Sequence, residues 1–182
     1  MTNRVFKIVP ASSSACFWFG VVFLSMLFPF VAISIQCYKD WGNFTPDFWI
    51  EVFGLIVIVG VAIIFLFFGY SARNGKVIVS ENGLTIKSFL YGRTLAKEVF
   101  LRDSILKLDL RNQRTFKPVG RRNGIGLPGY QAGWFRLANK EKALLFVTDK
   151  SRVVYLPTNM GYAVMLSLDE AEEFIKLMKE LN

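Results

Sequence analysis

Two kinds of hydrophobic pattern divide the chain near residue 70. Before that point, residues 15–37 (ACFWFGVVFLSMLFPFVAISIQC) carry no charge, and residues 48–70 (FWIEVFGLIVIVGVAIIFLFFGY) carry only Glu51. Each run is long enough to cross a hydrocarbon core of about 30 Å, and a backbone in lipid must satisfy its own hydrogen bonds. The pattern therefore predicts two transmembrane helices, the first with Pro29 as a site for a kink.

The orientation of these helices follows from the flanking cations. Arg4 and Lys7 precede the first run, Arg73 and Lys76 follow the second, and the loop between the runs holds one lysine against two aspartates. Because cytoplasmic segments carry the excess of Lys and Arg, we expect both termini on the cytoplasmic side of a cell inner membrane. Glu51 falls near the outer end of the second helix, where we expect a solvated or helix-start carboxylate.

After residue 70 the period changes to that of short strands separated by turn signals such as ENG, NKEK and DKS. The expected strands are residues 76–80, 84–88, 96–101, 105–110, 134–138, 143–148, 152–158 and 162–167. A helical stripe follows in Phe174, Leu177, Met178 and Leu181, with Ser167 or Asp169 as its cap. The sequence thus predicts a cytoplasmic tail (1–14), two transmembrane helices (15–70), and an antiparallel β-barrel or sandwich with a C-terminal capping helix (71–182).

One stretch of this soluble part carries a family likeness. It contains the turn G-x-G-x-P-G-Y-x-x-G from residue 124, an aromatic strand, a GY pair before the last strand, and an acidic helix start. With these features, residues 76–181 resemble the bacterial pleckstrin-homology-like (PH-like) family, whose domains follow one or two membrane spans. The resemblance implies a PH-like fold and a binding role, and it implies no particular ligand.

The glycines Gly124, Gly126 and Gly129 match the spacing of a dinucleotide-binding loop. Such a loop needs a strand before it and a helix that starts on it, so that the helix N-terminus can hold a pyrophosphate. Here Pro128 interrupts the pattern and a strand follows, so the sequence does not predict a nucleotide site. We expect these glycines to form a structural turn between strands, with positive φ or a sharp bend.

Charge singles out the segment just before these glycines. The chain has a net charge of +8, and residues 111–122 hold five cations and no acid. These cations are Arg111, Arg114, Lys117, Arg121 and Arg122. We expect a long basic connection between strands that contacts anionic lipid headgroups or a protein partner, because arginine pairs with phosphate oxygens in a fork.

Composition argues against an enzyme. The chain has no histidine, both cysteines (Cys16 and Cys37) lie in the apolar part, and no catalytic set, metal site or cofactor motif is identifiable. Nucleic acid is not expected as a partner, because no nucleic-acid motif accompanies the basic segment. The sequence predicts a non-catalytic, membrane-anchored binding or scaffold protein. The alternative is an accessory subunit of a larger membrane complex in transport or envelope synthesis, with a protein partner or further copies of itself.

Overall fold

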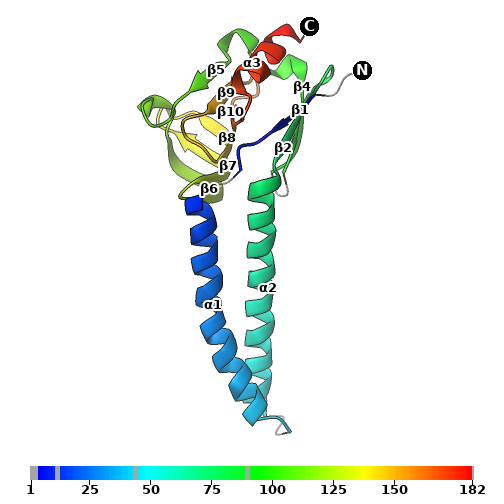
Figure 1. Cartoon of the computed structure of the whole chain (residues 1–182), viewed down its shortest axis with the longest axis vertical. Coiled ribbons are helices and arrows are strands. Elements are labelled where there is room, and N and C mark those ends of the chain that lie inside the picture. Colours follow the sequence, from blue (N-terminus) through cyan, green and yellow to red (C-terminus); the bar gives the residue numbers. More distant parts are fainter. Residues whose placement is uncertain (1–3, 11–12, 43–44, 89–90, 182) are drawn as a thin grey trace. The chain divides into compact units, whose positions relative to one another are not determined.

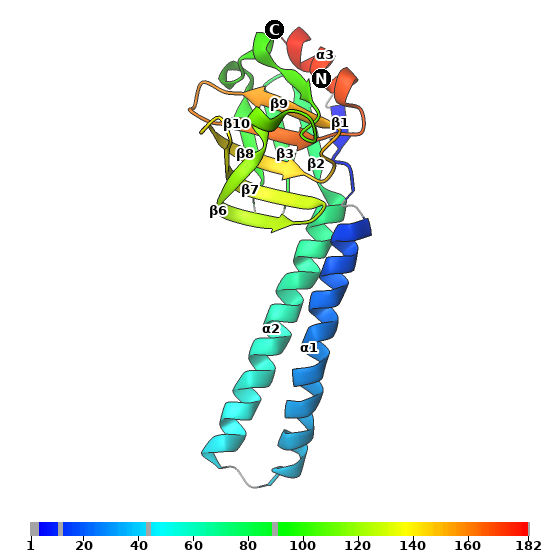
Figure 2. The same cartoon turned by 90° about the vertical axis from the view of Figure 1, so that its left-hand side faces the viewer.

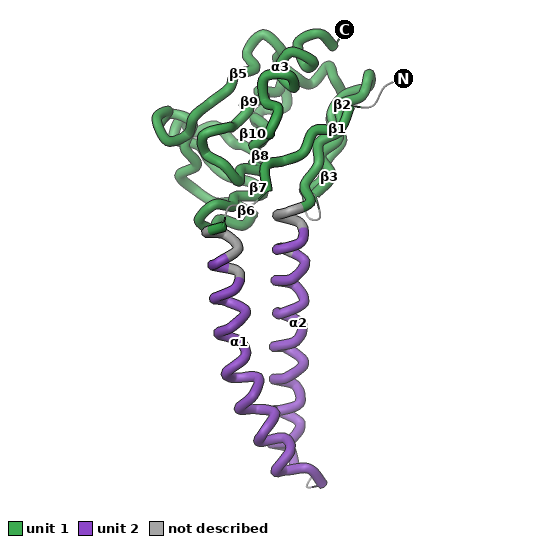
Figure 3. Tube along the Cα trace, viewed as in Figure 1, with its two compact units in different colours: residues 1–15, 71–182 green, residues 16–70 purple. Residues whose placement is uncertain are grey.

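The structure is a computed structural model of the 182-residue chain. It describes residues 4–10, 13–42, 45–88 and 91–181. These residues form two compact units, one made of residues 1–15 with 71–182 and the other of residues 16–70 (Figure 3). The β-rich unit therefore includes chain from both sides of the apolar region.

Two long helices make up the apolar unit. Helix α1 spans Ser13–Lys39 and α2 spans Pro46–Asn74, and Pro29 lies within α1 without ending it (Figure 1). The stretches Gly20–Lys39 and Pro46–Phe67 have mean hydropathies of 2.0 and 2.9, and each is long and apolar enough to cross a membrane.

The larger sheet of the β-rich unit has six strands in the order β5-β9-β10-β8-β7-β6 (Figure 2). They are β5 (Leu106–Leu108), β6 (Pro118–Leu127), β7 (Tyr130–Leu137), β8 (Lys142–Val147), β9 (Val153–Pro157) and β10 (Ala163–Ser167). Strand β10 lies between β8 and β9 and runs parallel to β8. The expectation of a purely antiparallel sheet is therefore wrong, because the DKS turn crosses the end of β10 instead of closing a hairpin between β8 and β9.

The smaller sheet has four strands in the order β1-β2-β3-β4. They are β1 (Arg4–Lys7), β2 (Lys76–Ser80), β3 (Gly83–Lys87) and β4 (Arg93–Ala96). Strand β1 comes from before α1 and pairs antiparallel with β2, which comes directly after α2. The segment predicted to be a separate tail is therefore part of the domain.

Short 3₁₀ helices connect several strands. They are η1 (Lys97–Val99), η2 (Arg102–Ser104) and η3 (Arg114–Phe116). The strand expected at residues 96–101 is replaced by β4 and η1. In the part of the chain described here, the two sheets do not join into a closed barrel. Isolated bridges at Ile8–Leu168 and Phe100–Thr158 link them, so the arrangement is two sheets and not a continuous barrel.

Every residue of β9 and β10, and every residue of β8 after Lys142, is buried. Because successive side chains of a strand point to opposite faces, both faces of this central part of the sheet must be covered. One face carries a cluster of buried apolar residues that includes Phe135, Leu145 and Met165, and Phe116 of η3 packs against it. The segment that leads into β6 thus helps to cover the sheet.

Helix α3 (Ala171–Glu180) closes the domain against both sheets. Phe174 is fully buried, and its ring meets that of Phe6 in β1 edge-on at 5.2 Å between centroids. Glu173 pairs with Arg4 of β1, and Glu172 pairs with Lys107 of β5. The helix begins after Glu170 with no side-chain cap, so the predicted caps Ser167 and Asp169 are wrong; Ser167 instead ends β10.

Candidate anion-binding site

Three lysines lie side by side at one end of the four-stranded sheet. Lys7 of β1 is directly opposite Lys76 of β2, and Lys76 is directly opposite Lys87 of β3. All three are exposed, and the described residues provide none of them with an ion pair. We call Lys7, Lys76 and Lys87 the lysine row. Like charges directly opposite one another on a sheet destabilise it unless counter-charges approach.

The lysine row lies where the chain passes into the apolar helices. Lys76 is two residues after the end of α2 at Asn74, a separation of at most about 7 Å of extended chain. Lys7 is six residues before α1 begins at Ser13, at most about 20 Å of chain. Connectivity therefore keeps Lys76 within about 7 Å of the end of α2 and Lys7 within about 20 Å of the start of α1.

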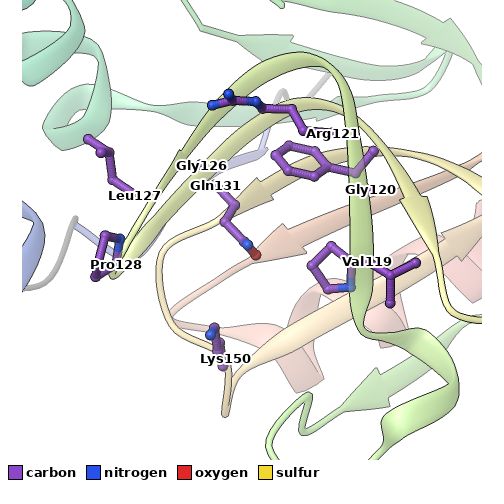
Figure 4. A pocket seen from close by; sticks show the side chains of 10 residues that line it. Val119, Gly120, Arg121, Gly126, Leu127, Pro128, Gln131 and Lys150 are labelled. Atoms are coloured by element: carbon purple, nitrogen blue, oxygen red, sulfur yellow. The ribbon is translucent and has the colours of Figure 1, made fainter.

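A second basic feature is a pair of adjoining hollows on the six-stranded sheet. One, of about 450 Å³, lies between β6 and the β8–β9 turn, and the other measures about 340 Å³. They share Pro118, Gln131 and Lys150, so together they form what we call the Gln131 pocket (Figure 4). Its lining includes four cations (Arg111, Lys117, Arg121 and Lys150) and, among the described lining residues, no acid.

Lys150 lies in the β8–β9 turn, and hydrogen bonds with Ser167 fix the backbone of this turn. The buried Ser167 hydroxyl accepts hydrogen bonds from the amides of Thr148 and Asp149, both at 3.2 Å, and donates to the carbonyl of Asp149 at 2.8 Å. The carbonyl of Lys150 then accepts from the amide of Leu110 at 2.8 Å. A turn that crosses the end of β10 would otherwise leave these amides unpaired, so the serine fixes the turn that presents Lys150.

Asp149 stabilises the same turn. Burial alone would raise the pKa of its carboxyl, but hydrogen bonds from the hydroxyl and amide of Ser151 and the guanidinium of Arg152 outweigh this and lower the pKa to about 2. The carboxylate is therefore ionised at neutral pH, and its oxygens already accept hydrogen bonds from Ser151 and Arg152. The cation of Lys150 beside it has no such partner among the described residues.

Gln131 occupies the centre of the pocket on β7. It pairs with Gly126 of β6 and Val147 of β8, so both neighbouring strands fix its backbone. Strand alternation places its side chain on the same face as Phe135, at the rim of the apolar cluster. The Oε1 atom of Gln131 is buried and has no hydrogen-bond partner among the described residues.

The structure distributes the five predicted basic residues over two environments. Arg111, Lys117 and Arg121 line the Gln131 pocket, whereas Arg114 lies exposed on η3 and Arg122 lies exposed on β6 at a shift of register between Arg121 and Asn123. The expectation of one long loop is wrong for residues 118–127, which form strand β6. The high glycine content and the scattered charges of this segment conceal its strand character from the sequence pattern.

The glycines also have a different role from the one expected. Gly124 and Gly126 lie within β6, so the prediction that they form a turn is wrong, whereas Gly129 follows Pro128 in the β6–β7 connection with φ of 77°. Gly124 is directly opposite Gly133 of β7. A Cβ on Gly124 would meet the carbonyl oxygen of Ala132 at 2.4 Å, so this glycine permits a close approach of two backbones.

Sequence reasoning did not single out the lysine row, Gln131 or Lys150 as site residues. The ENG hairpin already contained the signal for Lys76 and Lys87, because pairing Ser80 with Gly83 places them opposite each other. Gln131 and Arg136 are the two strongly polar residues of an otherwise mostly apolar strand. Lys150 could not be placed, since the parallel position of β10 was not predicted.

The described residues contain no group of three or more His, Cys, Asp or Glu side chains that could hold a metal ion. Residues 75–182 match the family described as bacterial PH domains. The chain belongs to this family. No curated protein and no solved structure matches the chain significantly. The PH domains are binding modules, which agrees with the arrangement of cations around a pocket in this one.

Proposed function

We propose that this protein is a non-catalytic binding and scaffold module that two transmembrane helices hold at the cytoplasmic face of a bacterial-type inner membrane. Both termini are then cytoplasmic, and the PH domain contacts anionic lipid headgroups. The apolar stretches of α1 and α2 support the membrane attachment. A reporter fused after Asn182 tests the orientation, and activity of that reporter only outside the membrane would overturn it.

The lysine row carries the proposal that the domain contacts lipid headgroups. Its three charges repel one another, and the chain holds them close to the ends of the helices. Attraction to an anionic leaflet contributes about 1 kcal/mol of binding free energy for each such cation near the surface. Headgroups at this position would supply the counter-charges that the protein itself does not.

The decisive experiment exchanges the lipid around the full chain. In nanodiscs of neutral phosphatidylcholine, we expect the Lys7→Gln, Lys76→Gln, Lys87→Gln triple variant to unfold at the same temperature as the wild type or slightly above it, because repulsion is removed. In discs that contain phosphatidylserine, we expect the wild type to gain stability and the variant to gain much less. Added salt reduces the wild-type gain, since screening shortens the reach of these charges to about 8 Å at physiological ionic strength.

A matched control removes the same number of charges elsewhere in the domain. Lys140, Lys176 and Lys179 are exposed and lie outside the lysine row and the pocket, so Lys140→Gln, Lys176→Gln, Lys179→Gln is the control variant. It is expected to keep the stabilisation by phosphatidylserine. The proposal would be contradicted if both variants lost the stabilisation by phosphatidylserine equally. It would also be contradicted if the stability of the wild type did not depend on lipid charge.

A second candidate function, an accessory subunit of a larger membrane complex, has one observation in its favour. Glu51 was expected to be a solvated or helix-start carboxylate. Its side chain interacts with Cys37 of α1, and its Oε2 is buried without a hydrogen-bond partner among the described residues. Ionisable groups within membrane helices commonly pair with groups on neighbouring helices. Purification in mild detergent distinguishes the two functions, because a stoichiometric second protein that is lost in Glu51→Leu would favour the complex.

A further inference from the structure

The Gln131 pocket contains an acceptor that the folded chain does not use. Gln131 Oε1 is buried and unpaired among the described residues, and Figure 4 shows the side chain pointing into the space between Pro128, Val119 and Lys150. A buried polar atom without a partner costs about 1–3 kcal/mol. An apolar residue at this rim of the cluster would avoid that cost, so the glutamine favours a ligand that donates a hydrogen bond.

The charges around this acceptor favour an anion in the same ligand. Lys150 lines both hollows, Arg121 lines the larger, and Lys117 lines the smaller. None of these three has an ion pair within the described chain. Arg111 also lines the smaller hollow, but its guanidinium already meets Asp109 at 3.2 Å. Lys117 and Lys150 both line the smaller hollow together with Gln131, and two ammonium groups around one space suit phosphate oxygens.

Apolar side chains also form part of the lining, so a carbon-bearing part of the ligand can pack against them. Val119, Leu127 and Phe135 line the larger hollow, whose volume of about 450 Å³ is within the range of small-molecule sites. The pocket also lies beside the chain that leads to α1. Val147 pairs with Gln131, and the next residue, Thr148, donates from its hydroxyl to the carbonyl of Val9 at 2.6 Å.

We propose that the Gln131 pocket binds a glycerophosphate-type ester, a phosphate ester of an alcohol that carries a free hydroxyl on the carbon next to the esterified one. The phosphate lies between Lys117 and Lys150 in the smaller hollow, and the hydroxyl donates its hydrogen bond to Gln131 Oε1. This inference rests on the proposed function and names the ligand chemistry. Two sources supply that chemistry, the headgroup of a glycerol phospholipid such as phosphatidylglycerol and a soluble polyol phosphate.

The hydroxyl is tested with two soluble probes on the full chain in phosphatidylcholine nanodiscs. Calorimetric titration compares glycerol 3-phosphate with methyl phosphate, which has the charge but no hydroxyl. We expect the wild type to bind glycerol 3-phosphate about five-fold more tightly, which is the worth of one neutral hydrogen bond. Equal affinities for the two esters, or no binding of either, would overturn the proposal.

Variants separate a ligand role for Gln131 from a structural one. In Gln131→Leu we expect the preference for glycerol 3-phosphate to vanish, methyl phosphate binding to persist, and the ligand-free melting temperature to rise, because a buried unpaired acceptor is removed. Gln113→Leu, an exposed glutamine outside the pocket, is the matched control and keeps the preference. Lys150→Gln is expected to weaken the binding of both esters. A Gln131→Leu protein that melts lower and keeps the five-fold preference would refute the assignment.

The two sources are distinguished by the lipid around the protein. If the headgroup is the ligand, discs with phosphatidylglycerol suppress glycerol 3-phosphate binding more than discs with phosphatidylserine, which carries the same net charge. Equal suppression identifies the soluble ester. Both results support the pocket, and neither depends on the lysine row. Loss of the phosphatidylserine response in the lysine-row variant therefore tests the proposed function separately.

Discussion

The amide of Ile8 donates a hydrogen bond to the carbonyl of Gly75 at 3.1 Å. Ile8 lies five residues before α1, and Gly75 directly follows α2, so this bond joins the two points at which the chain leaves and re-enters the domain. Val9, the next residue, donates to Ser167 at 2.9 Å. The two ends of the helical pair are thus held within one β-rich unit that contains strands from both sides.

Gly75→Ala is predicted to weaken this junction. An added Cβ would lie 2.9 Å from Ile8 Cδ1, the end of that side chain, so the isoleucine must shift and the junction is destabilised by about 1 kcal/mol. Hydrogen–deuterium exchange of the full chain in nanodiscs is expected to show faster exchange in β1 and β2. Because Ile8→Val removes the clashing methyl group, the double variant is expected to recover part of the loss, whereas strictly additive effects would contradict the packing argument.

Ser167→Ala is predicted to loosen the turn that presents Lys150. The substitution leaves the amides of Thr148 and Asp149 without their acceptor, at a cost of about 1–3 kcal/mol. We expect faster hydrogen exchange at residues 148–152 and weaker binding of both phosphate esters. Ser104→Ala, at an exposed position on η2, is the control and is expected to leave both measurements unchanged.

The sequence pattern predicted most of the fold because most elements are short apolar runs or regular apolar stripes bounded by turn signals. Strands at residues 76–80, 143–148 and 152–158 and the apolar stripe with Phe174 and Met178 were all found close to their expected places. Strand β1 was not predicted, because four residues beside an apolar run carry no usable period. The parallel pairing of β10 was not predicted either, since a short turn such as DKS ordinarily signals a hairpin.

The site was less predictable than the fold, because it depends on long-range pairing. Arg111, Lys117 and Arg121 could be selected by charge density alone, and the structure brings them to one pocket. Lys7 and Lys76 are far apart in the chain and become neighbours only through the pairing of β1 with β2. No local pattern reports such a contact.

Acid is predicted to destabilise the domain partly through Asp149. Its pKa of about 2 in the folded domain lies below the ordinary value of 3.8, so its contribution to stability is complete above about pH 5 and is lost progressively as the pH falls through 2. The side chain is only 29% exposed, and the contribution is roughly 2 kcal/mol. Asp149→Asn is expected to lower the unfolding free energy at pH 7 and to flatten this part of the pH profile. A variant profile parallel to that of the wild type would contradict the assignment.

Alanine substitutions are predicted to divide the glycines of the β6–β7 hairpin into two classes. At Gly133 the φ of 109° is strained for alanine, and its Cβ would lie 2.5 Å from the carbonyl oxygen of Asn123. Gly124→Ala places a Cβ 2.4 Å from the carbonyl oxygen of Ala132. Neither backbone can yield without opening the hairpin, so each change is expected to cost at least about 2–3 kcal/mol.

Gly126 is the matched control for this prediction, since it lies in the same strand and the same G-x-G-x-x-G pattern. Its added Cβ would meet the ring of Phe135 at 3.7 Å, an ordinary contact, so Gly126→Ala is expected to change the melting temperature of the full chain little. The measurement is thermal unfolding of all three variants in the same nanodiscs. If Gly126→Ala lowered the melting temperature as much as Gly124→Ala, the close approach of β6 and β7 would not explain the glycines. The strand would then need glycine for its flexibility.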